Sequence, residues 1–284
     1  MSTSEKVKGH LPIPSTWVFL GLAFALSWPI LIYGFGWFSS EEDILKRYLL
    51  SCTGMLAIAF SALITRIFIE RRGFQEAGWN PGHYKWYVGI LGFNLLLWLA
   101  PPLAALIFGN LDFNEHPTQD QLVVVFLSLG GFALLAGFGE EFGWRGYLLP
   151  RLLQNTRYTR GVLFVIGLIW GIWHCAVEIG PFIAASINHT GNPSAMLIPT
   201  FLNCLRGIGT SLVLSVIFGA LWLKTRSVLL TSFFHGCWIG IRDSVYILLS
   251  YPALFQLITL LPILVTWFFC DRWLKIYGKY DNLS

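Results

Sequence analysis

Eight long blocks of apolar residues, joined by short polar connections, make up most of this sequence. With ends placed to within a few residues, the blocks are 15–38, 48–68, 86–108, 121–142, 161–183, 195–223, 227–249 and 251–272. A helix needs about 20 apolar residues to cross a bilayer. In hydrocarbon, every backbone N–H and C=O must find a partner within a helix or a closed barrel. The blocks therefore predict an all-α, polytopic transmembrane bundle of about eight helices.

The composition also indicates lipid as the solvent. Charged residues are 12% of the chain and hydrophobic residues 55%, whereas a soluble domain carries about 25% charged residues. Because no repeat or long linker divides the chain, residues 1–284 are expected to form one membrane domain behind a tail of residues 1–14. The sequence Ala23-Phe24-Ala25 resembles the cleavage site of a secretion signal, but the first block continues to Phe38 and is interpreted as an uncleaved helix.

Positive charge is distributed unevenly between the connections. Only Lys46 and Arg47 lie in one alternate set, while Arg206 and Arg242 fall inside blocks. The other fifteen of the 19 Lys and Arg residues belong to the opposite set: Lys6, Lys8, Arg66, Arg71, Arg72, Lys85, Arg145, Arg151, Arg157, Arg160, Lys224, Arg226, Arg272, Lys275 and Lys279. Because Lys and Arg favour the cytoplasmic side, both termini are predicted to be cytoplasmic, in a bacterial inner membrane or a eukaryotic endoplasmic reticulum.

Other patterns exclude some classes of function. The net charge of +4 does not indicate a nucleic-acid partner, because the basic residues follow the topology and no P-loop, RNA-binding or zinc-finger pattern occurs. The cysteines lack close pairing and are interpreted as packing residues, not as disulfides or a metal cluster. They are Cys52, Cys175, Cys204, Cys237 and Cys270.

The densest group of ionisable residues lies at the end of the fourth block. An ionisable side chain inside a span costs about 2.5–3.5 kcal/mol and needs a structural or chemical reason. Glu141 and Arg145 are four residues apart and are expected to form an ion pair on one helix face. Glu140 is turned about 100° away from Glu141, so its carboxylate is free to point into a cavity. A charge cluster at the membrane edge is the plainer alternative.

Two histidines lie inside later blocks. His174 is in the middle of the fifth block, with Trp170 one turn before it and Glu178 one turn after it as a residue that could orient the ring. His235 is in the half of the seventh block that begins near the basic connections. Each histidine alone reads as a packing residue. The pair Arg242–Asp243 is interpreted as a structural ion pair.

Together these groups predict one site. The charge-based topology places the carboxylates and His235 in the cytoplasmic half, so Glu140, His174 and His235 are expected to converge on a cavity open toward the cytoplasm. A carboxylate with histidines in a partly dry cavity suits general-base activation of water. The same three side chains could instead bind Zn²⁺. Because no HExxH or other close pair of ligands occurs, we expect no required cofactor, with zinc as the alternative.

Residues 139–240 resemble the CAAX protease and bacteriocin-processing (CPBP) family, which includes the type II CAAX prenyl endopeptidases. The sequence Glu140-Glu141-x-x-x-Arg145 resembles the first family motif, and Trp170-x-x-x-His174 resembles the second. The third motif is represented by His235. The resemblance implies that Glu140 and His174 activate the attacking water, that His235 stabilises the oxyanion, and that Glu141 and Arg145 shape the site.

The chain departs from the family at one position. The family commonly places Asn four residues after the third-motif histidine, and here that residue is Ile239, which cannot donate a hydrogen bond. The leading hypothesis is an intramembrane endopeptidase acting on a membrane-anchored peptide or protein, for which a prenylated CAAX-type C-terminus is one form. The alternatives are a non-catalytic scaffold or bacteriocin-immunity protein of the same family, and a transporter, against which the lack of matching broken helices in two halves counts.

Overall fold

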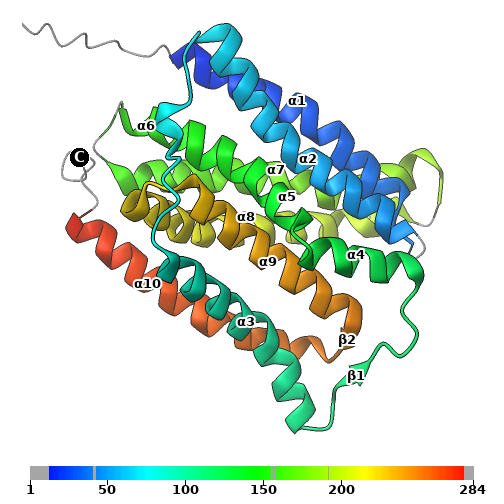
Figure 1. Ribbon diagram of the computed structural model, residues 1–284. Helices are drawn as coiled ribbons and strands as arrows, with labels where there is room; N and C mark the ends of the chain where they lie inside the picture. Colours follow the sequence, from blue (N-terminus) through cyan, green and yellow to red (C-terminus); the bar gives the residue numbers. More distant parts are fainter. Residues whose placement is uncertain (1–12, 41–42, 155, 157, 191, 278–284) are drawn as a thin grey trace, which may run out of the picture.

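The protein is a bundle of helices with one short pair of strands (Figure 1). The computed structural model describes residues 13–40, 43–154, 156, 158–190 and 192–277. In chain order the elements are α1 (Ile13–Trp37), α2 (Ile44–Ile64), η2 (Thr65–Ile69), η3 (Gln75–Ala77), α3 (Tyr84–Ile107), β1 (Asp112–Phe113), α4 (Gln119–Leu129), α5 (Phe132–Glu141), η4 (Phe142–Leu148), α6 (Leu149–Gln154), α7 (Thr159–Ile187), α8 (Pro193–Thr225), α9 (Val228–Leu248), β2 (Leu249–Ser250), η5 (Ala253–Thr259) and α10 (Leu260–Tyr277). The all-α membrane bundle is confirmed.

The number of spans differs from the expected eight. Within the described part of the chain, six helical stretches are long and apolar enough to cross a membrane, or seven if α4 and the helices that follow it count as one bent span. Helix α9, which covers the seventh apolar block, is not among them. Thirteen of its 21 residues, His235 among them, are buried inside the bundle.

The fourth apolar block is broken where two glycines meet. Helix α4 ends at Gly130, and Gly131 has a φ of 106°, a left-handed conformation that glycine adopts without a steric penalty. The chain bends there by 60° before α5 begins. By contrast, Pro101 and Pro102 lie inside a continuous α3. Packing against neighbouring helices makes such prolines tolerable in membrane helices.

Close packing of α5 positions the fourth block next to α2 and α9. A Cβ atom on Gly137 would lie 2.7 Å from the backbone nitrogen of Gly236, and one on Gly139 would lie 2.7 Å from the carbonyl oxygen of Met55. Small residues at such contacts let helix backbones approach closely in a membrane. The carboxylates that follow Gly139 are thereby held in the centre of the bundle.

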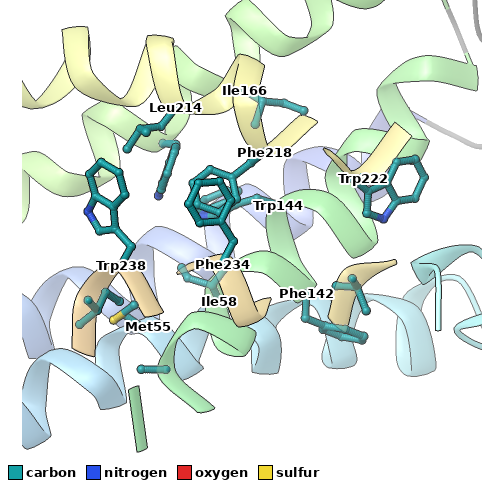
Figure 2. Packing of buried hydrophobic residues seen from close by; sticks show 14 of the residues in the cluster. Met55, Ile58, Phe142, Trp144, Ile166, Leu214, Phe218, Trp222, Phe234 and Trp238 are labelled. Carbon is teal, nitrogen blue, oxygen red and sulfur yellow. The ribbon is translucent and has the colours of Figure 1, made fainter. Parts of the chain in front are cut away.

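Aromatic rings fill the core around this point. The rings of Phe218 from α8 and Phe234 from α9 have centroids 4.7 Å apart, and Figure 2 shows them between Trp238 and Trp222. Trp144 is completely buried. These rings form an apolar layer across the interior of the bundle.

The two ends of the bundle differ in character. We call the end with the start of α1, α6 and the end of α10 the basic end, and the opposite end, with α4 and the β1–β2 pair, the hairpin end (Figure 1). At the hairpin end the strands pair antiparallel, Asp112 with Ser250 and Phe113 with Leu249. At the basic end the chain carries most of its Arg and Lys residues.

A buried ion-pair network fixes the basic end. The Glu70 carboxylate accepts hydrogen bonds from Arg66 (3.1 Å), Arg151 (2.6 Å) and the Tyr147 hydroxyl (2.8 Å). Arg151 also donates to Glu76. The Glu70 side chain is 2% exposed, so the connection after α2 is bound to η4 and α6 through fully paired charges.

Candidate active site

All three candidate catalytic residues line one cavity. Glu140 at the end of α5, His174 in α7 and His235 in α9 border a space of about 810 Å³ in the interior of the bundle. The catalytic roles of these residues stay predictions. Their convergence nevertheless brings together side chains from three helices that are far apart in sequence.

The Glu140 carboxylate is held by two indoles. Its Oε2 atom accepts hydrogen bonds from Trp170 Nε1 at 2.5 Å and from Trp144 Nε1 at 3.4 Å. Glu140 is 1% exposed to the surface and borders the cavity. Since only Oε2 has hydrogen-bond donors among the described residues, Oε1 is the oxygen left to face a molecule in the cavity.

Glu141 has a separate set of partners. Its Oε1 accepts from Arg145 Nη1 at 2.8 Å, and both side chains are completely buried. The predicted ion pair is therefore present. The same oxygen lies 3.0 Å from Nδ1 of His235. Two adjacent carboxylates thus have different functions in the structure, because Glu140 faces the cavity and Glu141 anchors an arginine and a histidine.

The Arg145 guanidinium lies between two aromatic rings. Its central carbon is 4.5 Å from the centroid of Trp170 and 5.0 Å from that of Phe218. Cation–π contacts of this kind contribute about 2 kcal/mol or more when the cation is desolvated. Residues Phe142–Leu148 form a π-helical segment, a geometry that is frequent at functional sites. Arg145 is thus fixed by Glu141 and by rings, and does not border the cavity.

His174 is oriented by its own helix and not by Glu178. Its Nδ1 lies 3.0 Å from the carbonyl oxygen of Trp170. Because a carbonyl oxygen only accepts hydrogen bonds, Nδ1 must carry the proton and Nε2 of the neutral ring has a free lone pair. Among the described residues no hydrogen bond joins His174 to Glu178, and the partner of the ring is the Trp170 carbonyl oxygen. The carbonyl oxygen of Trp170, four residues earlier on the same helix, is the acceptor that the ring reaches.

The departure at Ile239 lies on the wall of the cavity. Ile239 is 8% exposed and borders the same space as His235. The neighbouring polar residues on that face, Arg242 and Asp243, also border it, and they bind each other through Nε and Oδ1 at 2.7 Å. The predicted structural ion pair is therefore confirmed. Arg206, inside α8, borders the cavity too.

The cavity extends from the site toward the hairpin end, and the side of the membrane on which it opens stays a prediction. In the orientation that the charges predict, this end faces away from the cytoplasm. No described lining residue comes from 56–69 or 265–277, which lie toward the basic end. Buried Arg145, Phe218 and Phe234 close the bundle beneath the site. Residues along the path to the hairpin end are Phe35, Tyr48, Glu178, Asn203, Tyr246 and Gln256.

The three candidate residues do not form a metal centre. In the described ranges, no group of three or more His, Cys, Asp or Glu side chains is arranged to hold a metal ion. Glu140 is directed to two indoles and His235 to Glu141. The expectation that no cofactor is required, with zinc held by Glu140, His174 and His235 as the alternative, stays a prediction.

Two tryptophans are the functional neighbours that sequence reasoning missed. Trp170 was identified only as an aromatic on the same face as His174, whereas its indole binds Glu140, 30 residues earlier. Trp144 contributes the second donor from within the first motif. The i, i+4 spacing of Trp144 after Glu140 was the signal available for one contact. The other depends on how α5 and α7 meet.

The comparison with protein families agrees with this geometry. Residues 118–241 match the family model described as "Rce1-like: Type II CAAX prenyl endopeptidase Rce1-like". The match runs from the start of α4 into α9 and includes every candidate residue at the cavity. It confirms the resemblance to CAAX proteases and indicates CAAX-type intramembrane protease activity in general terms. No curated protein matches the chain.

Proposed function

We propose that this protein hydrolyses a peptide bond of a membrane-anchored polypeptide in the cavity. The match of residues 118–241 to the Rce1-like type II CAAX prenyl endopeptidase family supports this proposal. A prenylated CAAX-type C-terminus is one form of that substrate. The observation that carries the proposal is the Glu140 carboxylate, which borders the cavity while two indole donors fix it in place. Such a group is oriented for chemistry, and within the described ranges no cation forms an ion pair with it.

Glu140 is the proposed general base. A water molecule between its Oε1 atom and the scissile carbonyl loses a proton to the carboxylate as its oxygen attacks the carbonyl carbon. General-base assistance of this kind contributes typically about 10²–10⁴-fold to the rate. The buried setting, with Glu140 1% exposed, strengthens electrostatic interactions because little water screens them. His174, with Nε2 available as an acceptor, orients the same water.

His235 is the proposed stabiliser of the oxyanion. Its Nδ1 faces the Glu141 carboxylate, so the ring presents a proton at Nε2 only as an imidazolium. Glu141 supports that cation, while Arg145 shares the same carboxylate oxygen. When the tetrahedral intermediate collapses, the C–N bond breaks and the leaving nitrogen takes the proton that the water gave up. Each of these steps proceeds without a metal ion in this proposal.

A non-catalytic role in the same family is the second candidate. It is favoured by Ile239, because an aliphatic side chain on the cavity wall supplies no hydrogen bond to an oxyanion. A scaffold or immunity protein would use the bundle as a binding surface and would not depend on Glu140. The two candidates therefore differ in what they expect from one conservative substitution.

Replacement of Glu140 by Gln distinguishes the two candidates. Membranes of cells that express wild type or Glu140→Gln are compared by mass spectrometry of new peptide termini. Cleavage products present with wild type and absent with Glu140→Gln support the protease. Glu115→Gln is the matched control, because Glu115 is an exposed carboxylate in the connection between α3 and α4, away from the cavity. Equal termini in all three strains, together with an unchanged phenotype, would leave the scaffold as the function.

A further inference from the structure

A second cavity lies on the outer face of the bundle, apart from the candidate active site. It has a volume of about 430 Å³ and is bordered by residues of α3, α8, α9 and α10. No described residue lines both cavities. Trp86 is 37% exposed and Phe269 is 65% exposed, so this second cavity reaches the surface that lipid covers. We call the space between Trp86 and Phe269 the α3–α10 groove.

The groove forms where two helices separate above small residues. Near the hairpin end, η5 packs against α3 and leads into α10. Toward the basic end, α3 and α10 lie apart (Figure 1). A Cβ atom on Gly89 of α3 would lie more than 4 Å from the described residues of neighbouring helices, and Ala220 of α8 contributes only a methyl group to the lining. The groove is therefore an apolar space that the small residues leave unfilled.

Among the described lining residues, Lys224 is the charged one. It lies in the last turn of α8 and is exposed. Its Nζ atom is 5.5 Å from the ring centroid of Trp86 on α3 and 5.9 Å from that of Trp273 on α10. No described carboxylate forms an ion pair with Lys224, whereas Lys275 of α10 binds Asp271 at 3.2 Å. The ammonium group thus lies between two tryptophans of different helices, and its charge is available to an anion from outside the protein.

These features match the parts of a phospholipid. Trp residues favour the membrane–water interface, and basic pockets between membrane helices bind anionic lipid headgroups. We infer that the α3–α10 groove binds an anionic phospholipid. The lipid phosphate contacts Lys224 between the two tryptophans, and an acyl chain lies along Gly89 and Ala220. A zwitterionic lipid brings its own cation close to Lys224 and binds more weakly. The volume of about 430 Å³ falls within the range of about 300–1,000 Å³ found for ligand pockets.

Native mass spectrometry of the full chain in detergent tests the headgroup. Phosphatidylglycerol and phosphatidylcholine with identical acyl chains are titrated, and the apparent dissociation constant of the first bound lipid is measured. The wild type should bind phosphatidylglycerol about fivefold more tightly, equivalent to about 1 kcal/mol, which is the contribution of one Lys near an anionic lipid surface. Lys224→Gln should bind the two lipids equally. Lys275→Gln is the matched control and should keep the preference, because Lys275 is exposed at the same end but lies outside the groove.

Filling the groove tests the acyl chain. Gly89→Phe places a ring in the open space and should weaken the binding of both lipids by roughly tenfold or more, the factor given by about two buried CH₂ groups. Gly92→Phe is the matched control, because Gly92 lies on the same helix with equally open surroundings but does not border the groove. It should bind as the wild type does. Since Lys224 and Gly89 are exposed, all four variants should unfold in lipid-free detergent within a few degrees of the wild type.

Several results would overturn the inference. They are equal affinity of the wild type for the two lipids, an unchanged preference in Lys224→Gln, and unchanged lipid binding in Gly89→Phe. Tighter binding of an uncharged isoprenoid alcohol than of phosphatidylglycerol would assign the groove to an isoprenoid chain instead, and binding of inorganic phosphate with the affinity of phosphatidylglycerol would assign it to a free anion. Glu140→Gln should bind phosphatidylglycerol as the wild type does, so this test is independent of the proposed hydrolysis.

Discussion

Glu70 and Glu140 are both buried glutamates, but their surroundings differ. Glu70 receives two arginines and a tyrosine hydroxyl, all within hydrogen-bond distance. Glu140 receives only neutral indoles and borders a cavity. A buried carboxylate with cationic partners on both oxygens has no capacity for a further ligand. A buried carboxylate with one oxygen facing a cavity retains that capacity, and this difference separates a structural charge from a reactive one.

Glu141 lies between these extremes. It binds Arg145 as Glu70 binds Arg151, but it also contacts His235, which borders the cavity. Glu141 therefore connects the buried ion pair with Arg145 to the position of His235 at the cavity. The comparison predicts that substitutions at Glu70 change stability alone, that those at Glu140 change activity alone, and that those at Arg145 change both.

The largest expected effect is on catalysis, at Glu140. Glu140→Gln keeps the shape and an oxygen that can accept from Trp170, but it removes the base. Activity should fall by about 10²–10⁴-fold, and the thermal unfolding temperature should stay within a few degrees of wild type. Turnover of a peptide substrate and unfolding in detergent measure the two quantities. An active Glu140→Gln protein would show that Glu140, like Glu70, is a structural carboxylate and not a reactive one.

Arg145→Ala should lower both stability and activity. It leaves the Glu141 carboxylate buried without its cation, and the loss of one partner from a buried pair costs about 3–5 kcal/mol. The yield of folded protein and the activity per folded molecule should then decrease together. Arg145→Lys, which keeps the charge, should recover part of the yield. A fully stable Arg145→Ala protein with a defect for one substrate only would place Arg145 at the substrate.

Glu70→Gln should destabilise the fold without changing the chemistry. Arg66 and Arg151 would keep a hydrogen-bonding partner but lose its charge, so a decrease in unfolding free energy of about 1–3 kcal/mol is expected. The activity of the folded fraction should equal that of wild type. Size-exclusion profiles and turnover normalised to folded protein measure this. Loss of specific activity would show that the basic end participates in the reaction.

His235→Asn should reduce turnover by about 10²–10³-fold, the range found for the loss of one oxyanion donor. The reason is that Asn lacks the cationic donor while its size is close to that of the ring. A decrease in kcat with little change in KM is expected, because the contact forms in the transition state. A change in KM alone would assign His235 to substrate binding.

The smallest expected effect is a gain at Ile239. Ile239→Asn places an amide donor on the cavity wall near His235, and one hydrogen bond to a charged group contributes about 1.5–3 kcal/mol. Turnover should rise by about tenfold, since 1.4 kcal/mol corresponds to that factor. Ile239→Leu is the matched control and should leave turnover unchanged. A decrease with Asn would indicate that the cavity needs an apolar wall there.

Much of the architecture could be predicted from the sequence because lipid imposes a simple rule. Every apolar block became helical, and Glu141 and Arg145 bind each other because both lie on one helix, four residues apart. Helix α9 covers the seventh block but is not among the six or seven described stretches that are apolar enough to cross a membrane, because it carries many polar residues and packs inside the bundle. The tail of residues 1–14 and Ser284 lie almost entirely outside the described residues, so the side on which the termini lie stays a prediction.

The local properties of this protein follow from its sequence alone, namely the helices, the residue types inside them and the unequal charge of the connections. The tertiary structure decided which carboxylate faces the cavity, because the Glu140–Trp170 and Glu141–His235 contacts join residues 30 and 94 positions apart. Local periodicity specifies which face of a helix is apolar, whereas the space between helices depends on close contacts such as Gly137 with Gly236, and these form only when the whole bundle assembles.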